Sequence, residues 1–216
     1  MNIEMASIMQ SNKKSFQYKS LKINLHYEVY EPSEDTFLLL DSINVITNQK
    51  VLEIGAGTGI ISLYCAQKGA TVICSDINPY AIEIINKNIQ ENKKQLNGSI
   101  EVRTGDLFEI VIEKETFDII IFNPPYLPTT KDEKKGISEW YAKSFDGGPT
   151  GLTVTIKFLK ELKPYLKKDG KAYFIYSSLS KKQQLEQTLK SLSFKYTIIK
   201  KLRCDDEILS IYQISF

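Results

Sequence analysis

The turn Asn123-Pro124-Pro125-Tyr126 carries the side chains of this chain that are best suited to chemistry. It follows the apolar run Ile119–Phe122, which does not alternate and is typical of a parallel strand covered on both faces. Pro124 ends the strand and biases Asn123 toward an extended backbone, so polar oxygens project beyond the strand's carboxyl end. These oxygens can accept hydrogen bonds from an NH2 group, and Tyr126 offers a flat face to a planar substrate. The turn favours chemistry on an amide or amine nitrogen, although taken alone it is more often only a proline-rich loop.

A glycine turn forms the second motif. Gly55, Gly57 and Gly59 lie between an apolar stretch at 50–54 and an apolar helical stretch at 60–67. Glycines permit unusual backbone dihedrals and close approach of a ligand, while a helix N-terminus offers free N–H groups. A dinucleotide site places its third glycine at position 60, which is Ile60 here. The spacing therefore favours S-adenosylmethionine, which has no pyrophosphate, over a nicotinamide cofactor; a purely structural turn stays open.

Two acids follow the next strands along the chain. Asp76 ends the stretch 70–76, about 20 residues after the glycine turn, where an acid grips both hydroxyls of a ribose. We expect Asp76 and the adjacent Ile77 to contact the cofactor. Asp106 follows the stretch 100–104 and could accept the adenine amino group, with Leu107 lining the ring. On its own, Asp106 is more often a simple turn residue.

These motifs need a scaffold of alternating strands and helices. Stretches 50–54, 70–76, 100–104 and 117–122 predict strands, and Asn78 and Pro79 predict a helix start. Downstream, the pattern predicts a helix at 152–167, a strand at 171–178, a helix at 181–191 and strands at 194–202 and 208–215. The segment Leu127–Gly151 has little apolar periodicity and is expected to be a long functional loop. The βα alternation predicts an α/β fold with ligands at the carboxyl ends of the strands.

Three strand ends, each with a polar residue suited to one part of the same nucleoside, resemble the class I S-adenosylmethionine-dependent methyltransferases. The turn that begins at Asn123 narrows the resemblance to enzymes that methylate planar NH2 groups. The segment Tyr27–Asp41 looks like the Tyr-Glu-Pro-x-Glu-Asp-Thr/Ser-Phe-Leu-Leu signature of HemK-like release factor glutamine methyltransferases, in the short archaeal and eukaryotic branch. The resemblance spans roughly residues 27–176.

The resemblance implies a Rossmann-like, seven-stranded sheet with helices on both faces and a C-terminal antiparallel hairpin. It implies that S-adenosylmethionine is the cofactor and that Thr36, Glu53 and Gly55 line its pocket. The stretch from Trp140 to residue 151 is similar to the family's substrate loop, except that residues 145 and 146 are larger than expected. It further implies a small zinc-binding activator protein, which we expect along a sheet edge formed by Ser99–Thr104.

The expected reaction is N5-methylation of the glutamine in the Gly-Gly-Gln loop of a class I translation release factor. We expect Asn123 Oδ1 and the Pro124 carbonyl to accept the two N–H groups of the substrate amide, with Pro125 and Tyr126 completing the acceptor site. The alternatives are an N6-adenine or N2-guanine methyltransferase acting on RNA or DNA, a protein-lysine methyltransferase, or a binding module without activity. The net charge of +2 is too balanced to indicate nucleic-acid binding.

Length and composition predict a single domain at 21–216 after a mobile, polar segment at 1–20. No apolar run is long enough to span a bilayer and no signal peptide is evident, so we expect a cytoplasmic protein. The chain has one histidine and no Cys-x-x-Cys, which makes a metal site improbable, and Cys65, Cys74 and Cys204 are expected to be reduced core residues.

Overall fold

The structure is a computed structural model that describes residues 14–130 and 132–216. Its centre is a seven-stranded sheet in the order β5-β4-β3-β6-β7-β9-β8, beside a small two-stranded sheet, β1-β2. The strands are β1 (Ser15–Tyr18), β2 (Leu21–Asn24), β3 (Lys50–Ile54), β4 (Thr71–Asp76), β5 (Ser99–Thr104), β6 (Phe117–Phe122), β7 (Leu166–Ser177), β8 (Lys195–Cys204) and β9 (Glu207–Ser215). The helices are α2 (Glu34–Leu40), α3 (Ile60–Gln67), α4 (Pro79–Asn92), α5 (Glu139–Phe145), α6 (Thr153–Glu161) and α7 (Lys182–Ser191), with 3-10 turns η1 (Lys93–Gln95), η2 (Leu107–Ile110), η3 (Asp132–Lys134) and η4 (Lys163–Tyr165).

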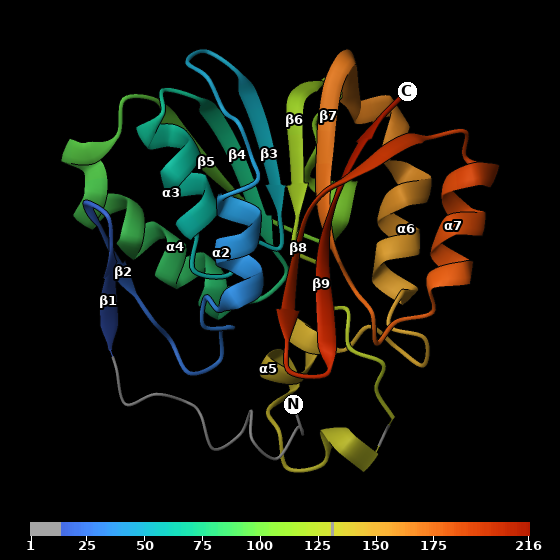
Figure 1. Ribbon diagram of the computed structural model, residues 1–216. Coiled ribbons are helices and arrows are strands. Elements are labelled where there is room, and N and C mark those ends of the chain that lie inside the picture. The colour runs from blue at the N-terminus through green and yellow to red at the C-terminus, as the bar shows by residue number, and fades with distance from the viewer. Residues whose placement is uncertain (1–13, 131) are drawn as a thin grey trace.

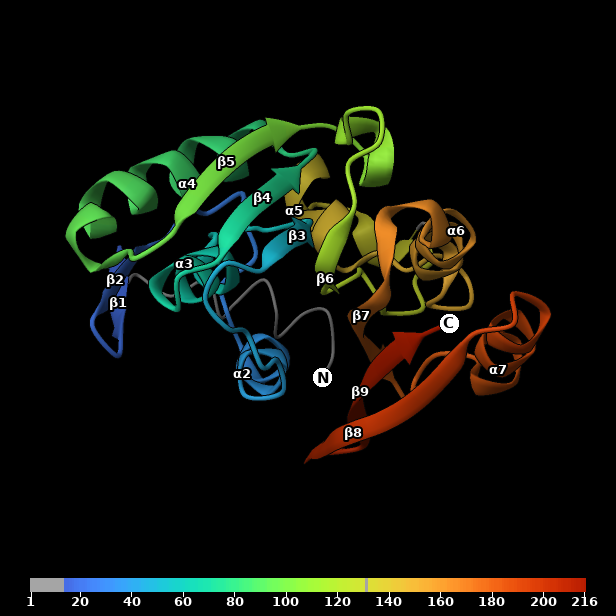
Figure 2. The ribbon, with the colours of Figure 1, turned by 90° about the horizontal axis from the view of Figure 1, so that it is seen from above.

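Helices cover both faces of the large sheet, as expected (Figures 1 and 2). Helices α2, α3 and α4 contribute to one apolar cluster, and α6 and α7 contribute to a second cluster on the opposite face. Central strands β3 and β6 have apolar side chains in both clusters, which explains their runs without alternation. Because β3, β4, β5 and β6 are parallel, their carboxyl ends meet at one edge of the sheet.

The C-terminal antiparallel hairpin is confirmed. Strand β9 pairs antiparallel with both β7 and β8, and β8 forms one edge of the sheet. Strand β5, at Ser99–Thr104, forms the other edge, as the sequence predicted. The Rossmann-like arrangement is therefore complete within the described chain.

The N-terminal segment differs from expectation. Residues 1–20 were expected to be mobile, but Ser15–Tyr18 and Leu21–Asn24 form an antiparallel hairpin; residues 1–13 lie outside the described part. The aromatic rings of Phe16 and Tyr18 pack against Phe37 of α2, which supplies the apolar contact that holds the hairpin to the domain. A strand of this length gives too little alternation for its pattern to be evident in the sequence.

Two further boundaries are corrected. The helix expected at 152–167 ends at Glu161, because Pro164 interrupts the ladder, and β7 already begins at Leu166. The segment Leu127–Gly151 is not entirely a loop, since α5 begins after Ser138, whose hydroxyl accepts the backbone N–H of Tyr141.

Among the described residues, no helix is long and apolar enough to cross a bilayer, and no group of acidic, histidine and cysteine side chains is arranged to hold a metal.

Candidate active site

A cavity of about 690 Å³ lies at the carboxyl ends of the parallel strands. The structure brings almost all the expected site residues to its wall: Thr36, Glu53, Gly55, Gly57, Asp76, Ile77, Asp106, Leu107, Asn123, Pro124, Pro125 and Tyr126. The cavity is large enough for a nucleoside-containing ligand together with part of a substrate. The separate motifs of the sequence therefore belong to one site.

Gly59 is the exception, because it does not line the cavity. It adopts a left-handed backbone (φ 77°) immediately before α3, and a Cβ atom there would lie 3.2 Å from the side chain of Ile85. Gly59 therefore serves the turn and the close packing of α3 against α4, while Gly55 (φ 62°) and Gly57 (φ 55°) face the cavity.

The backbone holds the Asp76 carboxylate in place. The N–H of Gly57 donates to Oδ2 at 2.9 Å, and the N–H of Asn78 donates to Oδ1 at 2.9 Å. Burial raises the pKa of Asp76, although these backbone N–H groups favour its ionised form. Asp76 also lines the cavity, and a carboxylate has lone pairs enough to accept two ribose hydroxyls in addition.

Glu53 lies beneath the glycine turn and is 3% exposed. Burial raises its pKa to about 8, although the Ser62 hydroxyl, which donates to its carboxylate, acts in the opposite direction. A nearby positive charge would lower the pKa of this carboxyl group and favour its ionised form. Glu53 is therefore suited to a cationic part of a ligand.

We expect the stability of the ligand-free protein to depend on pH through Glu53. The pKa of Glu53 is about 8 in the folded protein and 4.5 in the unfolded chain. The contribution of this group to the free energy of unfolding is therefore fully present below pH 4.5 and is lost as the pH rises through 8. The free energy of unfolding, measured with urea, should fall by at most about 1.4 kcal/mol per pH unit between pH 4.5 and about 8. In Glu53→Gln this component should vanish, and an unchanged pH profile in that variant would contradict the assignment.

Several buried polar atoms have no hydrogen-bond partner in the described structure, and some of them belong to residues that line the cavity. Thr58 Oγ1 and Asn123 Oδ1 are buried and have no hydrogen-bond partner in the described structure, and both residues line the cavity. A buried polar group without a partner costs about 1–3 kcal/mol. Together with the carboxylates of Asp76 and Glu53, these atoms fit the polar cofactor that the sequence predicted.

The expected adenine end differs in one detail. Asp106 Oδ2 accepts a hydrogen bond from Lys157 Nζ of α6 at 2.6 Å, so one carboxylate oxygen is already engaged. Leu107 has a left-handed backbone (φ 46°), which is uncommon for a residue with a side chain, and it is 3% exposed. Leu107 adds an apolar side chain to the cavity wall, while Asp106 shares its charge with Lys157.

Asp35 also lines the cavity, although the sequence alone indicates no role for it. Its Oδ2 accepts the side-chain N–H of Asn123 at 3.0 Å and the hydroxyl of Tyr126 at 3.2 Å. Burial, together with the nearby Asp35 carboxylate, raises the pKa of Tyr126. Because Asn123 Nδ2 is bound to Asp35, Oδ1 must be the atom that remains free to accept a hydrogen bond.

Part of the segment after the Asn-Pro-Pro-Tyr turn lies at the wall of the cavity. Trp140 of α5 lines it, and Phe145 is packed at 8% exposure. Asp146 accepts hydrogen bonds from the Thr129 hydroxyl and, at 2.9 Å, from the N–H of Gly148. The larger residues at 145 and 146 therefore fasten the loop to the domain.

The comparisons with known proteins agree with this geometry. Residues 31–144 match the family described as the methyltransferase small domain. The chain is 44% identical to a Methanocaldococcus jannaschii protein named as a protein N5-glutamine methyltransferase, over 90% of this chain and 95% of that one. It is 32% identical to the catalytic subunit mtq2 of the eRF1 methyltransferase of Schizosaccharomyces pombe, over 90% and 92%. The fold matches the E. cuniculi Mtq2–Trm112 complex, with a TM-score of 0.65 and 23% identity over 87% of this chain and 98% of that one.

Proposed function

The chain belongs to the methyltransferase small domain family and, within it, to the HemK-like protein N5-glutamine methyltransferases, and we propose that it methylates a release factor. The acceptor is the side-chain nitrogen of the glutamine in the Gly-Gly-Gln loop of a class I release factor. The observation that carries this proposal is the free, buried Oδ1 of Asn123, whose amide is oriented by Asp35. Such an activity belongs to the cytoplasm, where translation ends.

S-adenosylmethionine supplies an electrophilic methyl group when it is bound. Asp76 is placed to hold the ribose, Leu107 to pack against the adenine, and Glu53 to face a positively charged part of the molecule. These roles follow from the fixed carboxylates and the apolar wall described above. The methyl acceptor would then lie beside Asn123 and Tyr126, which line the same cavity.

A carboxamide nitrogen is a weak nucleophile, because its lone pair is delocalised into the carbonyl group. Asn123 Oδ1 and the Pro124 carbonyl accept its two N–H groups, and the Tyr126 ring packs against the amide plane. These fixed acceptors orient the nitrogen and stabilise the positive charge that develops as the new N–C bond forms. The nitrogen becomes acidic only during transfer, so it can lose its proton to water and no strong base is required.

The test of this function is methyl transfer from radiolabelled S-adenosylmethionine. The purified chain is incubated with a class I release factor, and with tRNA and DNA in parallel reactions. Label is expected in the release factor and at background level in both nucleic acids. Transfer to tRNA or DNA with none to the release factor would replace this proposal with the N6-adenine or N2-guanine activity.

The free edge at β5 supports a second part of the proposal, a small zinc-binding activator protein. Ile100 and Val102 lie on this edge strand, which has an unpaired row of backbone groups on one side. The E. cuniculi relative was solved in complex with Trm112, so a relative of this chain does assemble with a second protein. Addition of a strand to an open sheet edge is a common mode of recognition.

We expect the chain alone to have low methyltransferase activity that rises when the activator is added. The physical reason is that the unpaired backbone groups of the edge strand are covered in the complex. Activity and the molecular mass in solution are measured with and without the partner. A fully active, monodisperse monomer that does not respond to the partner would exclude this part of the proposal.

A further inference from the structure

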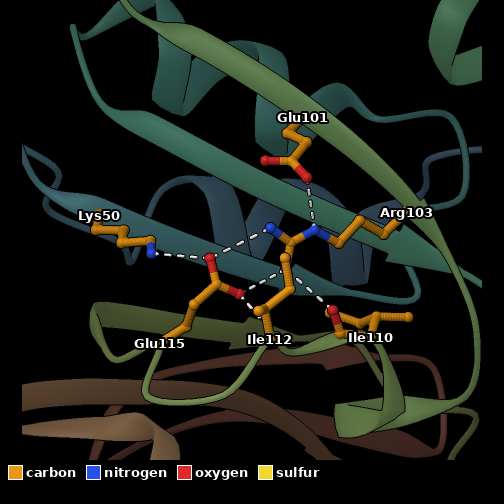
Figure 3. A network of polar contacts seen from close by, with 6 residues as sticks. All are labelled: Lys50, Glu101, Arg103, Ile110, Ile112 and Glu115. Carbon is orange, nitrogen blue, oxygen red and sulfur yellow. Dashed lines mark hydrogen bonds and ion pairs between the residues drawn. The ribbon is translucent and has the colours of Figure 1, made fainter.

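The segment between β5 and β6 carries the adenine end of the cavity, and one side chain ties it to the sheet. This segment includes Gly105, Asp106 and Leu107, all of which line the cavity. Figure 3 shows the guanidinium group of Arg103, from β5, between the carboxylates of Glu101 and Glu115. Neither Arg103 nor Glu115 lines the cavity.

Arg103 forms a bidentate ion pair with Glu115. Its NH1 nitrogen lies 2.6 Å from Glu115 Oε2 and its NH2 nitrogen 3.2 Å from Oε1, while Nε donates to Glu101 at 2.7 Å. The side chains of Arg103 and Glu115 are only 12% and 17% exposed. Such a shielded, bidentate pair is stronger and more directional than an exposed ion pair.

Glu115 collects further donors, so it fixes the far end of the segment. Lys50 Nζ of β3 lies 3.1 Å from Oε1, and the backbone N–H of Ile112 donates to Oε2 at 3.0 Å. The Arg103 guanidinium is the largest influence that lowers the pKa of Glu115 to about 2. Glu115 is therefore ionised across the physiological range, and the contact persists there.

The same guanidinium also reaches the cofactor side of the segment. Arg103 NH1 donates to the backbone carbonyl of Ile110 at 3.0 Å. The Ile110 side chain packs directly beneath Gly105, where an added Cβ atom would lie 2.5 Å from it. Leu107, between these residues, has the left-handed backbone (φ 46°), which persists only where the surroundings determine it.

We propose that Arg103 and Glu115 are positioning residues for the base of the bound nucleoside. Through Ile110 they fix the path of the backbone from Gly105 to Leu107, and hence the adenine wall of the cavity. Since Arg103 lies on edge strand β5, it also joins the free edge of the sheet to that wall. This inference rests on the proposed cofactor, but not on the identity of the methyl acceptor.

The test measures cofactor binding by calorimetry in Arg103→Gln. S-adenosylmethionine, S-adenosylhomocysteine and adenosine should each bind about tenfold more weakly, because all three share the base. The KM for S-adenosylmethionine should rise by the same factor, with kcat at saturating cofactor falling much less. The matched control is Lys22→Gln, which breaks the ion pair with Glu91 between β2 and α4; neither residue lines the cavity or bonds to Arg103 or Glu115 in the described structure.

Glu115→Gln keeps the shape of the side chain and serves as the second variant if Arg103→Gln does not fold. It should weaken all three ligands in the same way, by a smaller factor. Unchanged affinity for adenosine in either folded variant, or an equal loss in the Lys22→Gln control, would overturn the inference. If the parent binds the cofactor but transfers no methyl group to a release factor, the proposed acceptor fails while this inference is still decided by the binding data.

Discussion

Replacing Asn123 with alanine is expected to lower kcat by about 10²–10³, as is typical when a preorganised contact to the transition state is lost. The variant removes the free Oδ1 that should accept an N–H of the substrate amide, and it removes one of the donors to Asp35 Oδ2. Cofactor affinity should fall much less, because the other cofactor contacts remain. Single-turnover methylation of a release factor and calorimetry with S-adenosylmethionine measure the two effects separately.

Asp35→Asn is the companion variant for this result. It keeps the size of the side chain but has only one acceptor oxygen, whereas Asp35 accepts from Thr36 at Oδ1 and from Asn123 and Tyr126 at Oδ2. An amide in place of the carboxylate therefore turns an N–H toward one of these sets of donors, which weakens the fixed orientation of Asn123. Turnover should fall, but less than in Asn123→Ala, and cofactor affinity should be close to that of the parent. If Asn123→Ala retains turnover within a factor of a few, the turn is structural and the mechanism is wrong.

Asp76→Ala is expected to weaken S-adenosylmethionine by at least tenfold. The variant removes two charge-assisted hydrogen bonds to the ribose, each contributing about 1.5–3 kcal/mol. It also leaves the N–H groups of Gly57 and Asn78 without their acceptor, so part of the loss arises from the turn itself.

Asp76→Asn separates these two contributions, because it keeps a side-chain acceptor near the turn but removes the charge. Calorimetry should place its affinity between those of the parent and Asp76→Ala. A folded Asp76→Ala protein with the affinity of the parent would show that the ribose is held elsewhere.

The sequence predicted the core of the fold well, for physical reasons that act locally. Strands β3 and β6 are buried on both faces, so their apolar runs are unbroken, and the glycine turn demands a backbone that few other residues adopt. Because the strands are parallel, polar residues at their ends had to meet at one edge. The meeting of Asp76 and Asn123 in one cavity could therefore be predicted from the order of strands along the chain, without information on any tertiary contact.

The contacts that remained hidden join residues far apart in the chain. Asp35 and Asn123 are 88 positions apart, and Asp35 also satisfies the ordinary preference for an acid in the first turn of a helix. The helix preference alone explains an acid at this position, so the sequence does not indicate its contact with Asn123. Gly59 was assigned to the cofactor from spacing alone, whereas only the packing of α3 against Ile85 shows why a glycine stands there.

The measurement that tests the account most directly is mass spectrometry of a release factor after incubation with the protein and S-adenosylmethionine. One methyl group is expected on the side-chain nitrogen of the glutamine in the Gly-Gly-Gln loop. It should be absent when that glutamine is replaced by alanine and when the enzyme carries Asn123→Ala. A methyl group on another residue of the release factor, or undiminished methylation of the alanine-substituted factor, would contradict the assignment of a glutamine amide to the acceptor site at Asn123.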